Sequence, residues 1–531
     1  MRPLRSQLLM VLGIAATALS TGATLTFYEE SLPSTMNPLF AQSMVDNRVH
    51  ELVFDRIYYF DPVTNELVSK VVQTSEIADG GLSMRLTLKK GIRWHDGKPL
   101  SADDICFTIN AMLDPNTPSP IAEKQRAIFA GCTVEKPDIA LVKFTKVFFN
   151  PLNRLGFHIL PAHTFSGNTA IQPDAEFSTR PNGTGSATGS MGRRGATFEK
   201  FKNAHHDPQI DGMTLQEGQD PLVQVRTLLN NGVQGIVAVP PPYRADVSAS
   251  DDLSLKSYDL RSWWFAAVNQ SKPWLADKRV RQALNLLIDR TELRQLSIGV
   301  KPNEQNSPCE FISGPFVQSS PYYNRSVATQ PNSDQARAMA LLTEAGLKQV
   351  GGRWHFKGEP VTLRIGMKAP LDNEAPDLLS QIGNQLSAAG FDRQEFKITV
   401  DEWNGKVLTG QAQEFDLLIG KWSFGLVEDV NPLFHTRKSG RGAFNIFNFS
   451  NAQVDALLAQ FDVAKTDTQA QDAYHKLHEK LADELPYLFL WKLDTKSAWR
   501  TEVRGNTITP YYYWTVWDSW KYSGAPAAGG Q

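Results

Sequence analysis

The stretch from Met84 to Leu113, MRLTLKKGIRWHDGKPLSADDICFTINAML, predicts a strand, a turn and a helix in succession. Apolar and polar residues alternate over Met84 to Lys89, which is the period of a half-buried strand. Asp96-Gly97 is a turn signal. Ser101 is a suitable helix N-cap, and Asp104 completes a capping box with it before an apolar face begins. The stretch predicts local α/β structure and by itself indicates no function.

Strand and helix signals alternate along the rest of the chain, which favours an α/β fold with mostly parallel sheets. Apolar residues at helical spacing and stop signals such as glycine define the helices, and short apolar runs define the strands. We expect helices over 48–59, 220–231, 275–288, 334–346, 375–390, 451–463 and 467–484, and strands over 25–28, 236–239, 260–269, 360–366, 415–420 and 485–491.

Residues Leu86 to Asp114 resemble the signature LRxGvxWHDGxPLxAxDVxFxxxxxxD of the extracytoplasmic solute-binding proteins of peptide and nickel ABC transporters, family 5. Ile159 to Phe165 resembles a further segment of that family, ILPxHxF. The resemblance implies a periplasmic-binding-protein type II-like fold, with two α/β lobes, a hinge and an extra small domain. We expect a signal peptide over 1–23, lobe I over 24–45, 166–260 and 486–531, the small domain over 46–165, and lobe II over 261–485.

The resemblance also implies a function. We expect the substrate-binding component of an ABC importer, which captures a peptide or peptide-like solute between its lobes and delivers it to a permease driven by ATPase subunits. No cofactor is implied, and we expect a monomer. A metal chelate, an oligosaccharide or an opine-like compound is an alternative ligand, and chemosensing is an alternative role. A secreted hydrolase would need a paired nucleophile and base, and the sequence shows no GxSxG, HExxH or Walker motif.

Composition agrees with an exported globular protein. The chain has 531 residues, 41% hydrophobic and 21% charged, which is enough for two or three domains with sizeable cores. The net charge of −2 without a polybasic block argues against a nucleic-acid partner. Arg2 and Arg5 precede an apolar run from Leu8 to Leu19 and a cleavage point after Ala23, which predicts an export signal and a soluble periplasmic protein. A retained membrane anchor is the weaker alternative because the run is short for a bilayer.

Three cysteines, Cys106, Cys132 and Cys309, leave at least one thiol unpaired. Cys106 lies among the apolar positions of the helix after Ser101, so we interpret it as a small buried hydrophobe. A bridge between Cys132 and Cys309 stays open in an oxidising compartment.

The ligand site is expected to consist of aromatic side chains and a few polar groups. Family members place an Asp three residues beyond a cleft Trp, where it pairs with the peptide amine, and this chain has Gly425 at that position. Either of two nearby carboxylates can substitute for it, or both can cap their own loop. The candidate ligand-binding residues are Gln42, Met44, Trp263, Trp264, Trp403, Trp422, Glu428 and Asp429, and each Trp has a core position as its alternative.

Three other patterns have structural interpretations that we favour over chemical ones. His205-His206-Asp207 suggests a metal site, but successive side chains tend to diverge, and we expect a solvated loop. His475, His478 and Glu479 share a helical face, which we expect to be solvated. The Gly- and Ser-rich run from Gly183 to Ala196 lacks the Lys of a phosphate-binding loop, so we expect a flexible crossing between domains.

Overall fold

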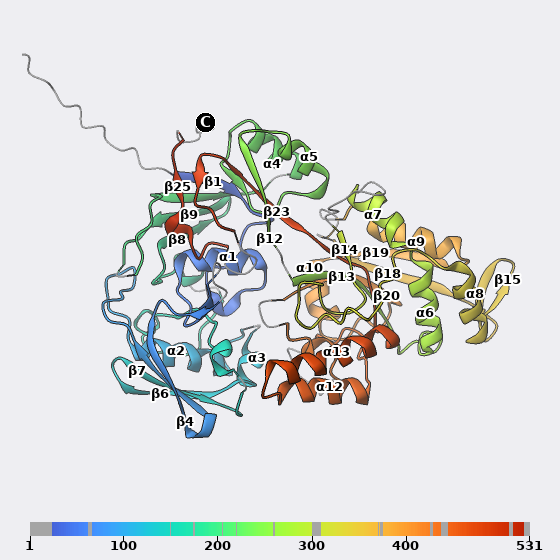
Figure 1. Ribbon diagram of the computed structural model, residues 1–531, viewed down its shortest axis with the longest axis horizontal. Helices are drawn as coiled ribbons and strands as arrows, with labels where there is room; N and C mark the ends of the chain where they lie inside the picture. The colour runs from blue at the N-terminus through green and yellow to red at the C-terminus, as the bar shows by residue number, and fades with distance from the viewer. Residues whose placement is uncertain are drawn as a thin grey trace, which may run out of the picture.

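The computed structural model describes residues 24–61, 66–119, 121–148, 150–173, 176–203, 205–218, 220–258, 261–299, 309–369, 371, 375–424, 428–436, 444–508 and 513–524. The expected signal peptide, residues 1–23, lies outside this part of the chain. Figure 1 shows two bodies, one containing the blue to green elements and the other the yellow and orange ones. Within the described residues, no helix combines the length and the apolar character that a bilayer crossing requires.

A seven-stranded sheet forms the centre of the first body, which we call lobe I. Its strand order is β12 (Leu253–Tyr258), β23 (Thr495–Arg500), β11 (Gly235–Ile236), β1 (Thr24–Tyr28), β10 (Gly212–Gln216), β9 (Gly195–Lys200) and β8 (Ala187–Gly192). Only β1 pairs in parallel, with β10 and β11. The helices of this lobe are α1 (Met44–Val53), α4 (Pro221–Leu229) and α5 (Arg244–Ser248).

The small domain contains a four-stranded antiparallel sheet. The order is β4 (Val72–Ala78), β5 (Ser83–Leu88), β7 (Ile139–Phe144) and β6 (Phe129–Lys136). Helices α2 (Ala102–Leu113) and α3 (Ala122–Arg126) accompany it, and a short hairpin of β2 (Tyr59–Phe60) and β3 (Leu67–Val68) precedes it. Figure 1 places this domain beside lobe I, in the same body.

Lobe II is the second body, and its sheet has the order β19 (Asp392–Ile398), β18 (Thr362–Lys368), β20 (Leu417–Phe424), β13 (Arg261–Val268) and β21 (Tyr487–Phe489). Strand β18 is parallel to β19 and β20, and β13 is antiparallel to both of its neighbours. Both large sheets are therefore mixed, and the expectation of mostly parallel sheets was wrong. The helices are α6 (Lys278–Leu287), α7 (Arg290–Ile298), α8 (Gln335–Glu344), α9 (Leu378–Ala388), α10 (Val400–Glu402), α11 (Asn431–Phe434), α12 (Ala452–Asp462) and α13 (Asp467–Glu484).

The shorter strands lie in three small sheets. In lobe II, β14 (Cys309–Phe311) pairs with β22 (Trp491–Leu493), and β15 (Lys348–Val350), β16 (Arg353–Phe356) and β17 (Glu359–Pro360) form a meander. Strands β24 (Val503–Arg504) and β25 (Lys521–Tyr522) pair near the C-terminus.

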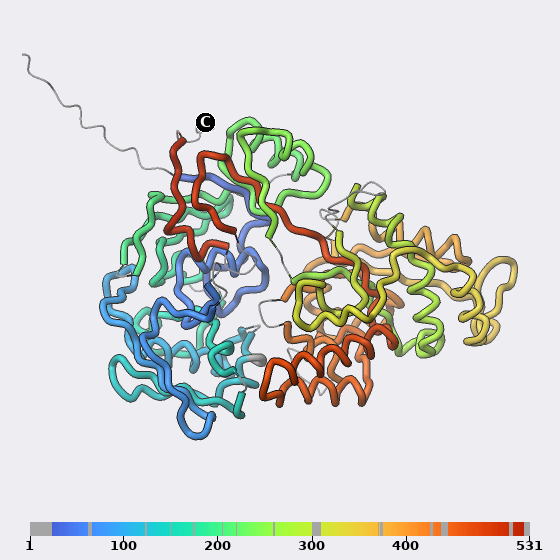
Figure 2. Tube along the Cα trace, in the orientation of Figure 1, coloured from blue at the N-terminus to red at the C-terminus, as the bar shows by residue number. Residues whose placement is uncertain are grey.

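Two neighbouring chain segments connect the lobes. Strand β12 of lobe I leads into β13 of lobe II, and β22 of lobe II leads back into β23 of lobe I. Strands β12 and β23 pair with each other in lobe I, and β13 pairs in lobe II with β21, which precedes β22. Figure 2 shows the red returning segment passing from one body to the other. Adjacent crossings of this kind suit a hinge because few residues need to change conformation.

The opening sequence stretch folds as predicted, into β5 and α2. The backbone N–H of Ser101 donates to the Asp104 carboxylate over 2.9 Å, as in a capping box. The same carboxylate accepts from the Trp94 indole (3.2 Å) and from the Ala162 backbone (2.9 Å). The signature residues thus hold the small domain together.

Glycines 183 and 185 let the chain pass directly against the end of α1. A Cβ on Gly183 would lie 1.8 Å from the Val53 carbonyl oxygen, and the Gly185 N–H donates to that oxygen over 2.8 Å. His95 holds the same segment because its Nδ1 accepts from the Gly183 N–H over 3.1 Å. The following Gly- and Ser-rich residues form the β8–β9 hairpin, so the expected flexible crossing was wrong.

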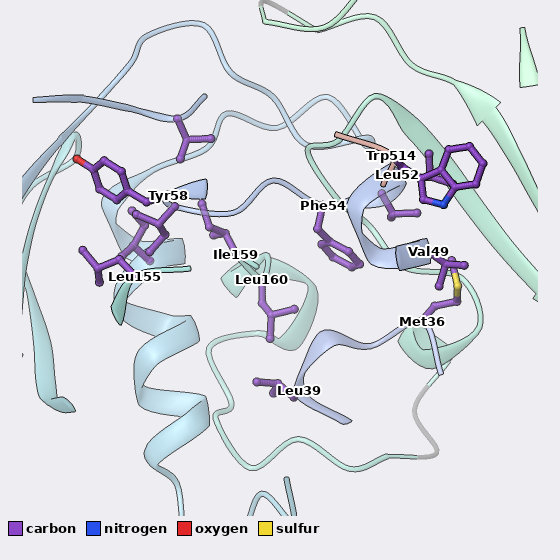
Figure 3. Packing of buried hydrophobic residues seen from close by; sticks show 14 of the residues in the cluster. Met36, Leu39, Val49, Leu52, Phe54, Tyr58, Leu155, Ile159, Leu160 and Trp514 are labelled. Carbon is purple, nitrogen blue, oxygen red and sulfur yellow. The ribbon is translucent and has the colours of Figure 1, made fainter. Parts of the chain in front are cut away.

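A continuous hydrophobic core joins lobe I to the small domain. Figure 3 shows side chains of α1 packed with those of the segment that includes Ile159 and Leu160 and with Trp514 near the C-terminus. Tyr513, Trp517 and Trp520 are fully buried in the same core. Residues 513–520 therefore complete a core to which β1 also contributes.

Two further expectations were wrong in detail. Helix α1 begins at Met44, where Ser43 and Asp46 form a capping box, and it ends before Phe54, whose backbone is extended. The predicted helix over 48–59 was therefore placed too late in the chain. Cys106 on α2 forms a disulfide with Cys132 on β6, with Cα atoms 4.8 Å apart, and Cys309 is buried and lies outside this disulfide. This pairing excludes the Cys132 to Cys309 bridge.

Candidate functional site

Charged residues lie at or near the carboxyl ends of parallel strands in both large sheets. Glu30 follows the carboxyl end of β1 in lobe I, and Lys368 ends β18 in lobe II. Lys421 and Trp422 lie near the carboxyl end of β20, which is parallel to β18. Ligands of open α/β sheets bind outside the carboxyl ends of the strands, so we take this region as the candidate site.

Charges of opposite sign meet across this region. Burial raises the pKa of Glu30, and the cations of Arg48 and Lys421 lower it. The effect of the cations is the larger, so the Glu30 pKa lies below its usual value. Burial, with a smaller effect of Lys421, lowers the pKa of Lys368. Lobe II therefore contributes two neighbouring ammonium groups, one of which interacts with a carboxylate of lobe I.

An internal ion pair fixes the position of Glu30. Arg48 of α1 contacts both oxygens of Glu29 through Nε (3.0 Å) and Nη2 (2.8 Å), and Glu29 and Arg48 are buried. Arg48 Nη2 also lies 3.5 Å from Glu30, whose side chain is 37% exposed. Burial lowers the pKa of Arg48, but the two carboxylates outweigh it and raise the pKa. Of these two glutamates, only Glu30 has a side chain exposed to a ligand.

Trp422 provides an apolar surface near the same strand end, on the face of β20 opposite to that of its neighbour Lys421. Its indole is half-buried and stacks on Phe265, with ring centroids 5.7 Å apart and an interplanar angle of 12°. Phe444 packs on it at 5.9 Å. An aromatic ring held in this way presents a rigid apolar face at small entropic cost.

The other three tryptophans named from the sequence lie in the interior. Trp263 and Trp264 are fully buried on β13 and point to opposite faces of the sheet, where each joins a different hydrophobic cluster. Trp403 is 4% exposed and packs over Gly420, where an added Cβ would lie 2.8 Å from its ring. These side chains build the lobe, and we do not carry them into the proposed site.

The two candidate substitutes for the missing Asp already have protein partners. Glu428 is fully buried, lies 3.3 Å from Arg261 Nη1 and accepts a hydrogen bond from Ser320 Oγ. Asp429 is half-buried and accepts from the Asn431 backbone N–H over 3.1 Å. Gly425 itself lies outside the described residues.

The two lobe I candidates lie at the start of α1. Gln42 is exposed, and its backbone N–H donates to Asp46 over 2.9 Å. Met44 is the first residue of α1, is half-buried and packs against the lobe I core. Gln42 is the more exposed of the two.

Neither histidine group is a solvated surface, which corrects both expectations. His206 is 5% exposed, and His205 and His206 contact Asp55, whereas Asp207 is exposed and pairs with Lys202 at 2.7 Å. His478 is fully buried, where its Nδ1 accepts from the Asn324 N–H over 3.0 Å. Of the helical face that was expected to be solvated, Glu479 is exposed as predicted.

The fold and the strand-end region define a class, the two-lobed binding proteins. The profile of the family "Bacterial extracellular solute-binding proteins, family 5 Middle" matches residues 66–444. The chain belongs to this family, which confirms the family, the fold class and the role of solute-binding component of an ABC importer that the signature predicted.

Individual relatives agree with this assignment. The chain is 23% identical over 502 residues to the oligopeptide-binding protein AppA of Bacillus subtilis, which covers 90% of this chain and 88% of the relative. The solved structure of that AppA in complex with a nonapeptide is similar to this chain, with a TM-score of 0.81 and 19% sequence identity. The match covers 95% of this chain and 99% of the AppA chain. The structure of NikZ of Campylobacter jejuni in complex with Ni(L-His) is also similar, with a TM-score of 0.78 and 19% sequence identity. The match covers 94% of this chain and 99% of the NikZ chain.

Sequence reasoning missed Glu30, Lys368 and Lys421. Each lies within a strand or just after its carboxyl end, and that position is a signal available from sequence. Aromatic residues attracted attention because of their size, whereas a lysine at a strand end resembles any solvated charge. The pairing of β18 with β20 brings the two lysines together, and Glu30 lies in the other lobe, where no sequence pattern links it to them.

Proposed function

We propose that the protein binds a short peptide or peptide-like solute between its lobes, closes on it, and delivers it to a membrane permease driven by ATPase subunits. The family and the peptide-binding relatives support this ligand class. The single observation that carries the proposal is the electrostatic interaction of Glu30 in lobe I with Lys421 in lobe II, near the strand end that also carries Trp422. A peptide has an amine and a carboxylate, and these two side chains match both.

We assign the roles as follows. Glu30 receives the peptide amine, Lys421 with Lys368 receives a carboxylate, and Trp422 covers an apolar side chain. Gln42 lies at the lobe I rim. Glu428 pairs with Arg261 and Ser320, and Asp429 accepts a hydrogen bond within its own loop. The protein acts without turnover, as an exported periplasmic monomer: ligand contacts with both lobes favour the closed form, which the permease distinguishes from the open one.

Calorimetric titration of the purified protein with a peptide library tests the ligand class. We expect binding of free peptides, and weaker binding after N-acetylation or C-amidation, because either change removes a charge. Glu30→Gln and Lys421→Met should each weaken binding about tenfold, or about 1.4 kcal/mol. Lys146→Met is the matched control, because it removes a different ion pair between the bodies, Lys146 to Asp462 at 3.4 Å.

Two results would contradict the proposal. Binding of a metal chelate or an opine-like compound without binding of any peptide would exclude the peptide class while leaving the transport role. Equal peptide affinity in the wild type and in both charge variants would exclude the assigned residues.

A further inference from the structure

A second cluster of polar side chains lies apart from the strand ends, where the end of α1 meets the loop before β10. His205 Nε2 lies 2.7 Å from Asp55 Oδ2, and His206 Nε2 lies 3.0 Å from Asp55 Oδ1. The imidazole centroids are 4.1 Å apart. These three residues offer donor atoms that all lie within 4.8 Å of one another.

The backbone holds the two histidines in this arrangement. Asn203 and His206 exchange backbone hydrogen bonds of 3.1 and 3.2 Å, which reverses the chain between them. The Asn203 side chain is in turn fixed to the backbone of Arg93 by bonds of 3.1 and 2.6 Å. Successive side chains tend to diverge, so their convergence on one carboxylate depends on this anchored turn.

Further groups surround the cluster in the pattern of an outer coordination shell. His206 Nδ1 lies 2.7 Å from the carboxylate of Asp518, and the Thr184 hydroxyl donates to Asp55 Oδ2 over 2.7 Å. Lys70 Nζ lies 3.8 Å from Asp518. In metal sites the second nitrogen of a ligating histidine donates to a carboxylate, and ligating carboxylates accept further hydrogen bonds.

We propose that Asp55, His205 and His206 bind a divalent transition metal of the zinc class, with Asp518 orienting His206. Imidazole and carboxylate are ligands that zinc accepts, and three protein ligands leave a fourth position for water. Tetrahedral bonds of about 2.1 Å require donor atoms about 3.4 Å apart, so small shifts of the present donors admit the ion. Asp55 and His206 are each 5% exposed, and the His205 side chain, at 12%, is the most exposed of the three.

The site would cross-link three segments that are distant in sequence: the end of α1, the histidine loop and the C-terminal segment. This role does not depend on the solute held between the lobes. The test therefore uses the ligand-free protein, and its failure would leave the proposed peptide binding untouched.

The experiment is a zinc titration of the full mature chain after chelator treatment and removal of any affinity tag. We expect one zinc ion per chain and a higher melting temperature, because an ion that binds the folded state stabilises it. Magnesium should produce no shift, because it prefers oxygen ligands. Asp518→Asn should weaken zinc binding about 10- to 100-fold, and His205→Gln should weaken it more.

The matched control is His163→Gln, which removes a histidine that contacts a single carboxylate, Asp96, at 2.7 Å. Zinc affinity should be unchanged in this variant. His205 is the most exposed of the three proposed ligands, so His205→Gln gives a result even where a His206 variant does not fold. Absence of a zinc-induced shift in the wild type, or equal zinc affinity in wild type and His205→Gln, would overturn the proposal. The visible spectrum of bound cobalt gives a second readout, and it should be lost in His205→Gln.

Discussion

Removal of the Cys106–Cys132 disulfide should destabilise the small domain without preventing its assembly. The bridge links α2 to β6. With a sequence separation of 26, the loop-closure relation gives a stabilisation of about 3.5 kcal/mol at 25 °C. The double variant Cys106→Ala, Cys132→Ala should lose about this much free energy of unfolding, because its unfolded chain is no longer constrained.

Two assays check this. Non-reducing peptide mapping of protein from an oxidising compartment should identify one linked pair, Cys106 with Cys132, and one thiol, Cys309, that reacts only after denaturation. Urea unfolding should then show the lower midpoint in the double variant, whereas Cys309→Ala, which breaks no bridge, gives the control for loss of a cysteine. A Cys132 to Cys309 peptide, or three reactive thiols, would refute the structural pairing. An unchanged midpoint would refute the entropic argument.

Three more predictions concern stability. Arg48→Met should cost about 3–5 kcal/mol in urea unfolding because it leaves the buried Glu29 carboxylate without its cation. Gly183→Ala should lower the melting temperature strongly, because its Cβ would lie 1.8 Å from the Val53 carbonyl oxygen. Burial, with His475, lowers the pKa of His478 to about 4 from 6.5. The unfolded state therefore binds more protons between these values, and stability should fall by up to about 3 kcal/mol as pH drops from 6.5 to about 4.

Each of these three has its own check. Combining Arg48→Met with Glu29→Gln should recover part of the loss, and simple additivity would contradict the buried pair. Gly405→Ala is the matched glycine control, because a Cβ there meets nothing within 4 Å, and it should stay near the wild-type melting temperature. An identical pH dependence of unfolding in wild type and His478→Gln would contradict the assigned titration.

Sequence signals predicted the fold well where the residues that determine an element lie within or next to that element. Residues 84 to 113 contain their own alternation, turn and cap, and β5 and α2 followed. The β8–β9 hairpin could not be predicted in this way. In the sequence, Gly189 suggests a flexible loop. In the structure it allows close packing, because side-chain atoms of Met36 and Val53 lie 2.8 Å from the position that a Cβ would take.

The candidate site was predicted less well, for a geometric reason. Adjacent residues on a strand face opposite sides, so Trp263 and Trp264 enter the hydrophobic clusters on the two faces of the lobe II sheet, and neither is left to contact a ligand. The partner of His205 and His206 is Asp55, which lies 150 and 151 residues earlier in the chain. No local spacing indicates such a partner.

The position of β23 has a consequence for how the protein is made. This strand, Thr495–Arg500, lies between β11 and β12 in the lobe I sheet, and the tryptophans that close the adjacent core come later still. Lobe I cannot finish folding until almost all of the chain has been synthesised, and pairings between residues so distant in sequence form slowly. The nascent chain therefore cannot complete lobe I until translation is almost finished.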